Sequence, residues 1–107
     1  MARKPRPNRE TIELLAERLE TTLPSWDGLE AAVIEYAEPV GKLGGGLPRL
    51  VYSGPGCVRE YIRQGMKPGE AMEFAEFNLF GQYIGDQTPI VVWPIPGDLF
   101  GSEGENQ

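Results

Sequence analysis

Residues 68–89 read PGEAMEFAEFNLFGQYIGDQTP, and this stretch decides the fold. Proline suits the first turn of a helix and the acidic side chains that follow complement the positive end of the helix dipole, so we expect a helix beginning near Pro68. Apolar side chains surround almost the whole second half, which is typical of a helix buried between other elements. Gly85 suits a left-handed cap, and the β-branched run of residues 90–93 predicts a strand after the turn. The stretch therefore predicts a long central helix followed by a strand.

Two residues interrupt the pattern of this helix. Asn78 projects onto the same arc as Phe74 and Ala75, so we expect its amide to be at least partly buried and to need hydrogen-bond partners. Gly81 costs about 1 kcal/mol relative to alanine inside a helix, which indicates a close approach or a kink. The favoured interpretation is structural, with Asn78 tying a loop to the helix. The alternative places both residues in a ligand-facing notch.

The rest of the chain predicts two more helices and two more strands. Asn8 suits the N-cap of the first helix, and alternating and β-branched residues favour the first strand. The predicted elements are a helix over residues 9–22, a strand within 29–38, a glycine-rich hairpin connection over 41–48, a strand over 49–53 and a short helix over 57–64. These elements predict an α+β fold, in which a small three-stranded, mainly antiparallel sheet packs against the long central helix and two shorter helices, in the order α-β-β-α-α-β.

Length and charge indicate a single domain with a basic arm. The 107 residues fit one domain over residues 9–100, and we expect residues 1–8 to be disordered and residues 101–107 to fray. The first nine residues hold four basic residues and no acid, whereas the other 98 hold 6 basic and 16 acidic residues. Since such an acidic body repels phosphates, nucleic acid is disfavoured as a partner. The chain has no apolar run near 18 residues and no signal-peptide pattern, so we expect a cytoplasmic protein without a membrane span.

The inventory of reactive side chains argues against catalysis. The chain has no histidine, which excludes Ser-His-Asp and Cys-His sets. Its single cysteine, Cys57, has no basic partner and is interpreted as a small buried residue in a reducing compartment. Glu73 with Glu76, or Glu76 with Asp86, could at most hold Mg²⁺ or Ca²⁺, and we interpret these acids as solvated helix-start residues. The sequence thus predicts no enzyme, no metal and no cofactor.

Candidate contact residues are aromatic, charged or amide side chains. They are Tyr52, Arg59, Arg63, Asn78, Tyr83, Asp86 and Trp93. Two arginines four residues apart on one helical face can receive an anionic group, and the aromatic side chains can stack a flat ligand. The alternative is that the arginines are merely solvated and the aromatic residues belong to the core.

A series of single residues and short motifs forms a signature along the chain. It comprises Val51-Tyr52, Gly65-Met66, Glu70-Ala71, Phe74, Glu76-Phe77-Asn78, Gly81, Tyr83-Ile84-Gly85 and Thr88-Pro89. This order resembles a family of small proteins encoded by tailed bacteriophages and prophages, and the resemblance covers residues 29–89. Ser53 and Gly54 follow Tyr52, where the family commonly has an aspartate and a basic residue. The resemblance implies no established activity.

Three functional hypotheses follow. The resemblance, the small size and the missing catalytic sets favour a non-enzymatic phage accessory protein that binds and modulates a host protein in the host cytoplasm. The first alternative is a binder of small, nucleotide-like ligands that uses the glycine loop at residues 44–46 and the two arginines. The second is an acidic mimic of nucleic acid, with carboxylates aligned in rows on one face. A homodimer is also compatible with a small sheet that has two open edges.

Overall fold

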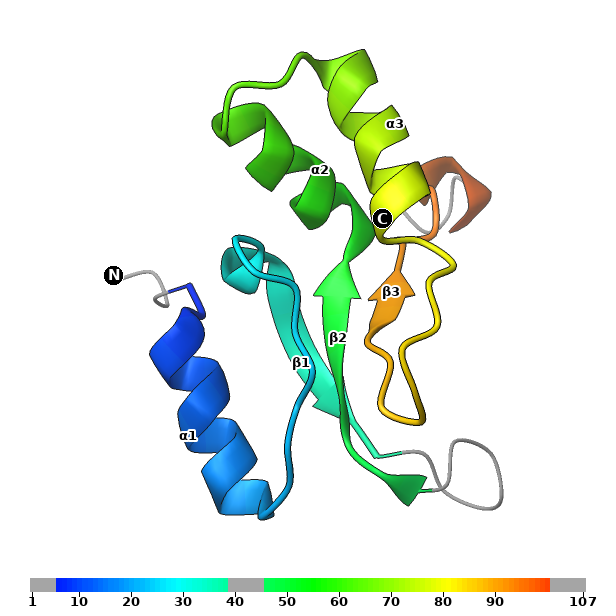
Figure 1. The fold of residues 1–107 in the computed structure, drawn as a ribbon. Coiled ribbons are helices and arrows are strands. Elements are labelled where there is room, and N and C mark those ends of the chain that lie inside the picture. Colours follow the sequence, from blue (N-terminus) through cyan, green and yellow to red (C-terminus); the bar gives the residue numbers. More distant parts are fainter. Residues whose placement is uncertain (1–5, 39–45, 101–107) are drawn as a thin grey trace, which may run out of the picture.

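The computed structural model describes residues 6–38 and 46–100 and has an α+β architecture, as predicted (Figure 1). Its elements are α1 (Arg9–Leu19), the 3-10 turn η1 (Glu30–Ala32), β1 (Val33–Ala37), β2 (Arg49–Ser53), α2 (Gly54–Arg63), α3 (Pro68–Asn78), β3 (Ile90–Val92) and the 3-10 turn η3 (Gly97–Phe100). Figure 1 shows α1 beside β1, with α2 and α3 beyond one end of the sheet. Residues 1–5 of the predicted arm, the predicted tail at 101–107 and most of the hairpin connection, residues 39–45, lie outside the described residues.

The sheet is mixed rather than mainly antiparallel. β2 lies at its centre, antiparallel to β1 and parallel to β3. The parallel pair arises because the chain passes through both α2 and α3 between β2 and β3, and such a crossover returns the chain in the same direction. A short turn would have produced the predicted antiparallel arrangement. The register shifts between Val33 and Glu35, so β1 contains a bulge.

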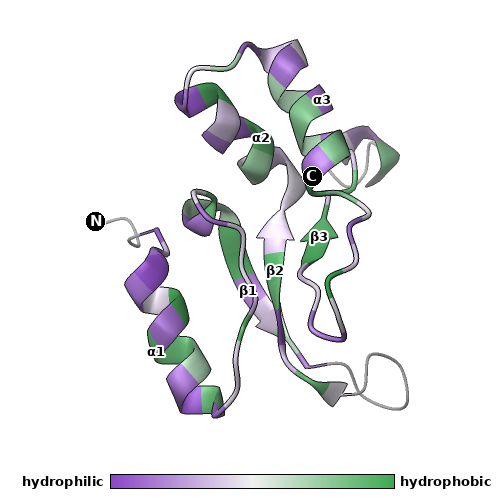
Figure 2. Ribbon diagram, in the orientation of Figure 1, coloured by the Kyte–Doolittle hydropathy of each residue, from purple (hydrophilic) through white to green (hydrophobic). Residues whose placement is uncertain are grey.

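The core lies on one face of β2. Leu50 and Tyr52 are fully buried there, together with Leu29 and Cys57. Because successive side chains of a strand point to opposite faces, Val51 and Ser53 belong to the other face of the sheet. Figure 2 colours β3 and the first part of β1 as hydrophobic, in agreement with a core built on the strands. α1 contributes Ile12 to this core.

The predicted long central helix is wrong in its length and its burial. α3 has 11 residues, as many as α1, and buries only Ala71 and Ala75. The helix ends at Asn78 because Gly81 adopts a left-handed conformation with φ 84°, which turns the chain away. The apolar residues that follow, which were expected to extend the helix, therefore lie in the connection to β3.

The starts of the helices follow local capping signals. Asn8 caps α1 as predicted, since its Oδ1 accepts the Thr11 backbone N–H at 2.9 Å. The helix ends before the predicted residue 22, where Glu20 takes a left-handed conformation with φ 57°. α2 begins at Gly54, three residues earlier than predicted, because Ser53 Oγ accepts the Gly56 backbone N–H at 2.9 Å.

Candidate functional site

Tyr52 lies in the core and not on a ligand-facing surface. Its hydroxyl oxygen accepts the backbone N–H of Trp26 at 2.8 Å, and the two ring centroids lie 4.7 Å apart. Burial raises the pKa of Tyr52 to about 12. The residue therefore joins β2 to the segment that follows α1.

Replacing Tyr52 by phenylalanine is expected to lower the free energy of unfolding by about 1 kcal/mol. The ring contacts remain, but the Trp26 N–H loses its acceptor. The cost falls at the low end of the usual range because Trp26 is only partly buried. Urea denaturation of both proteins measures the effect. Tyr36→Phe, at an exposed tyrosine of β1, is the matched control, and equal stability of all three proteins would contradict the prediction.

Asn78 is exposed, so its predicted burial is wrong. Its Nδ2 donates to the Phe74 carbonyl oxygen at 2.8 Å, one turn back along α3. The amide therefore satisfies a carbonyl within its own helix and ties no loop to it. Gly81, the other residue singled out, supplies the turn after the helix.

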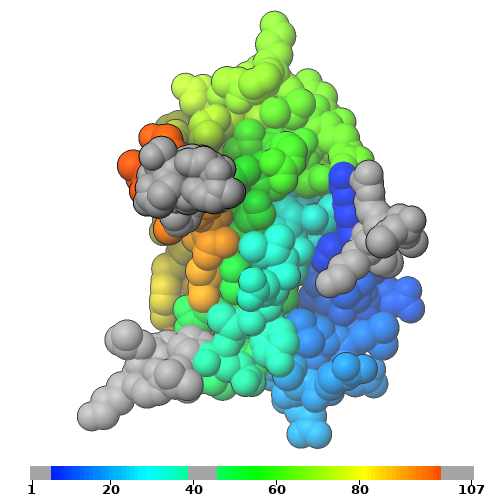
Figure 3. Space-filling model, turned by 180° about the vertical axis from the view of Figure 1, so that it is seen from behind, coloured from blue at the N-terminus to red at the C-terminus, as the bar shows by residue number. Residues whose placement is uncertain are grey.

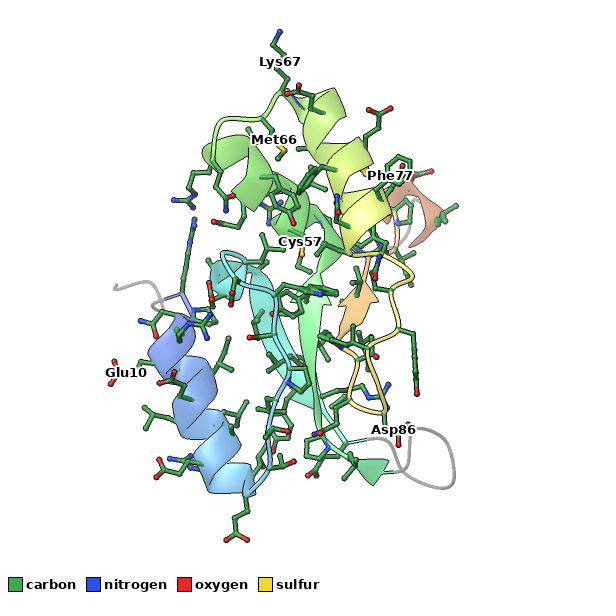
Figure 4. All side chains as sticks on the ribbon, in the orientation of Figure 1. Glu10, Cys57, Met66, Lys67, Phe77 and Asp86 are labelled. Atoms are coloured by element: carbon green, nitrogen blue, oxygen red, sulfur yellow. The ribbon has the colours of Figure 1, made fainter. Side chains whose placement is uncertain are left out.

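Tyr83 and Asp86 meet in the connection between α3 and β3. The Tyr83 hydroxyl donates to Asp86 Oδ1 at 3.3 Å, and both side chains are exposed. Thr88 Oγ1 accepts the Ile84 backbone N–H at 2.8 Å and donates to the Gly85 carbonyl oxygen at 2.7 Å, which holds this turn. Figure 4 places Asp86 at the opposite end of the molecule from Lys67, the residue that precedes α3.

Gln87 organises the same connection, although no sequence pattern had indicated a role for it. Its Nε2 donates to the carbonyl oxygens of Thr22 and Pro48, each at 2.9 Å. These bonds join the connection to the segment after α1 and to the start of β2. Only the tertiary structure brings the three segments together, because Gln87 lies 65 residues from Thr22.

Trp93 lies at the junction of β3 and α2, whereas the two arginines lie further along α2. The Trp93 ring packs across Gly54 and makes an edge contact with Phe80, with centroids 5.3 Å apart. Arg59 and Arg63 are exposed on α2. The seven predicted contact residues thus do not form one site, because they are divided among the core, the last residue of α3, the connection to β3, the end of β3 and the outer side of α2.

The largest hollow lies along α3 and is lined mainly by residues that were not predicted to bind. This surface, called the α3 groove below, has a volume of about 580 Å³. Its lining residues are Met66, Glu70, Glu73, Phe74, Phe77 and Asn78. Phe77 is 81% exposed and Phe74 is 41% exposed, although the Phe74 ring also contacts Tyr61 edge-on. Figure 4 shows Met66 where α2 leads into α3, and Phe77 near the other end of α3.

The helical spacing explains how these side chains come together. Residues 70, 73, 74, 77 and 78 recur at three- and four-residue intervals, so they form one stripe along α3. Glu70 and Glu73 occupy its first part and the two phenylalanines its second. The sequence could have shown this stripe, but the apolar residues after Asn78 suggested that the phenylalanines would be buried.

The described residues hold no metal-binding cluster and no accessible thiol. They contain no group of three or more carboxylate or cysteine side chains suited to a metal ion. Cys57 is fully buried, and burial raises the pKa of its thiol to about 12, so it is not a nucleophile at neutral pH. In the same part of the chain, every helix is too short or too polar to cross a membrane. Exposed carboxylates lie on α1 and α3, which lie apart in Figure 1, and also on β1 and on the segments between the elements.

Comparison with known proteins gives no relative from which a role could be transferred. No family model, no curated protein and no solved structure matches the chain.

Proposed function

We propose that this chain is a non-enzymatic protein-binding module that docks its partner on the α3 groove. The observation that carries the proposal is the exposure of Phe77, which leaves 81% of a large aromatic side chain in water beside a second, partly exposed phenylalanine. Burying such a side chain is worth about 1.5 to 3 kcal/mol. Contiguous exposed apolar surface of this kind marks interaction sites on soluble proteins.

The charges around the groove indicate the chemistry of the partner. Glu70 and Glu73 line the same stripe as the phenylalanines. A partner that inserts apolar side chains between Phe74 and Phe77 therefore meets two carboxylates one turn away. Lysine or arginine residues flanking the apolar anchors would complement them and would speed association.

The resemblance to small phage proteins supports a host protein as this partner. Met66, Glu70, Phe74 and Asn78 belong to the signature that carries the resemblance, and all four line the α3 groove. Part of the signature therefore lies on this surface, whereas Val51, Tyr52 and Ala71, which also belong to it, are buried. On this proposal the protein acts in the cytoplasm of a bacterial host, where it modulates the protein that it binds.

Replacing Phe77 by alanine is expected to weaken partner binding about tenfold without unfolding the protein. The fold should survive because Phe77 is almost fully exposed and its side chain packs little against the body. The measurement is quantitative mass spectrometry of proteins captured from a bacterial host lysate, followed by affinity measurements on the captured partner. Circular dichroism checks that each variant is folded.

Leu14→Ala is the matched control for this experiment. Leu14 is an exposed apolar residue on α1, away from α3. The intact protein and the Leu14→Ala variant should capture the same partner, and a photo-crosslinking residue at position 77 should attach to it. Equal capture by the Phe77→Ala variant, or attachment at position 14 and not at position 77, would refute docking on the α3 groove.

A further inference from the structure

Three arginines converge on a small hollow beside α2. Arg6 comes from the segment before α1, and Arg59 and Arg63 come from α2; together with Glu60 they line a hollow of about 140 Å³. Glu60 Oε2 lies 3.4 Å from a guanidinium nitrogen of Arg6 and 3.4 Å from one of Arg63. The carboxylate therefore holds two of the three guanidinium groups at the hollow. The third, Arg59, makes no ion pair with any residue in the described part of the chain.

The charge of this hollow is opposite to that of the protein. Three arginines and one glutamate give it a local charge of +2, whereas the whole chain carries −6. A phosphate monoester carries about −1.5 to −2 charges at neutral pH and offers three terminal oxygens. Guanidinium groups match phosphate oxygens with paired, directional hydrogen bonds. The hollow therefore suits one phosphate monoester better than a singly charged carboxylate.

Arg59 also lines a second, apolar groove next to the hollow. This groove has a volume of about 330 Å³ and crosses the ends of the three strands. Its other lining residues are Ile34, Ser53, Pro55, Val92, Trp93 and Pro94. The strand residues among them, Ile34, Ser53 and Val92, lie on the face of the sheet opposite the core, and Figure 3 shows the molecule from behind, with β1 in cyan and β3 in orange. An apolar groove with one aromatic wall suits a flat ring.

We propose that the hollow and the groove form one site for a small molecule in which a phosphate monoester is attached to a flat ring system, as in a nucleoside monophosphate. The phosphate lies among Arg6, Arg59 and Arg63, and the ring lies in the groove beside Trp93. Arg59 stands at the junction, where it contacts the phosphate and borders the ring. This site lies on the outer side of α2 and the sheet, does not use the α3 groove and does not depend on partner docking.

Isothermal titration of the full chain with adenosine monophosphate, inorganic phosphate and adenosine tests the site. Adenosine monophosphate is expected to bind with one-to-one stoichiometry and at least tenfold more tightly than either fragment, because it fills both parts of the site. A 5′-phosphorylated trinucleotide should bind no more tightly than the monophosphate, since the rest of its chain would meet the acidic surface. Tighter trinucleotide binding would overturn the small-molecule proposal in favour of nucleic acid.

Substitutions in the two parts of the site should have different effects. Arg63→Gln is expected to weaken adenosine monophosphate and phosphate alike, about tenfold, since it removes one guanidinium group. Ile34→Ser is expected to weaken adenosine monophosphate and adenosine but not phosphate. Both residues are exposed, so the fold should tolerate the changes. Arg18→Gln, which removes an exposed cation in the last turn of α1, should change none of the three affinities.

Three further outcomes would overturn the proposal. The first is no binding heat with adenosine monophosphate in the millimolar range. The second is equal affinity for adenosine monophosphate and phosphate, which would mean that the groove does not bind the ring. The third is an equal loss of affinity in Arg18→Gln and Arg63→Gln, which would mean that anion binding depends only on the total charge of the protein.

Discussion

Between pH 9 and pH 12 the protein is expected to lose on the order of 5 kcal/mol of its free energy of unfolding. Two fully buried groups cause the loss, Tyr52 in β2 and Cys57 in α2. Burial raises the pKa of Tyr52 from 10.0 to about 12, and it raises the pKa of Cys57 from 9.0 to about 12. A small domain has a total stability of about 5 to 15 kcal/mol, so this loss is enough to unfold it.

The direction of the effect follows from which state holds the protons. Above pH 9 for the thiol and above pH 10 for the phenol, the unfolded chain releases protons that the folded chain retains. The stabilisation is therefore fully present below these values and is lost as the pH rises towards 12. Since neither group has a basic partner, no ion pair opposes the loss.

Urea denaturation at pH 8, 10 and 11.5 measures this dependence. In the Cys57→Ala variant the thiol is absent, so the decline should be about half as steep, although the small cavity costs about 1 kcal/mol at pH 8. In the Tyr52→Phe variant the phenol is absent, so the free energy of unfolding should fall only by the part that the Cys57 thiol causes. A stability that stays constant to pH 11.5, or an unchanged decline in both variants, would show that neither buried group governs the alkaline behaviour.

Local signals predicted the parts of the fold that depend on neighbouring residues. The N-cap at Asn8 and the strand over residues 49–53 agree with the structure because helix capping, and the strand start that follows a glycine- and proline-rich connection, depend on only a few neighbouring positions. Local signals could not predict the direction of β3 in the sheet. It depends on how α2 and α3 return the chain to the sheet, which is a property of the whole crossover.

The error at α3 shows how a glycine can outweigh hydrophobic periodicity. The apolar residues before and after Gly81 continue a helical pattern, and so they suggested one long buried helix. Gly81 instead takes a left-handed conformation, so the helix does not continue through the apolar residues that follow it. As a result Phe77 is left in water rather than between other elements.

The sequence predicted only part of the candidate sites. Arg59 and Arg63 were identified from their helical spacing, and the structure places them in one hollow. Arg6 could not be assigned to that hollow, because it lies 54 residues before Glu60 and reaches it only through the tertiary fold. Tyr52 was selected by its residue type, whereas its burial depends on Trp26 and on the strand register.

Replacing Gly54 by alanine is expected to destabilise the protein by about 3 kcal/mol, the upper part of the range for overpacking. A methyl group at this position would lie 2.4 to 2.6 Å from three carbon atoms of the Trp93 ring. The backbone of Gly54 is not left-handed, so the conformation itself admits alanine. Helix propensity alone would favour alanine by about 1 kcal/mol, and the sign of the change therefore distinguishes the steric contact from propensity.

Gly69→Ala is the matched control, because it introduces the same methyl group into a helix at a position where no atom beyond the adjacent residues and the local helix backbone lies within 4 Å. This variant should be as stable as the parent or more stable. In Gly54→Ala the Trp93 ring must move away from α2, so its fluorescence should shift to longer wavelength along with the loss of stability. A double variant that combines Gly54→Ala with Trp93→Leu tests the same contact. Its stability should be nearly equal to that of Trp93→Leu alone, because the clash requires both the added methyl group and the Trp93 ring. If the two glycine variants changed stability equally, a steric clash between the added methyl group and the Trp93 ring would be refuted.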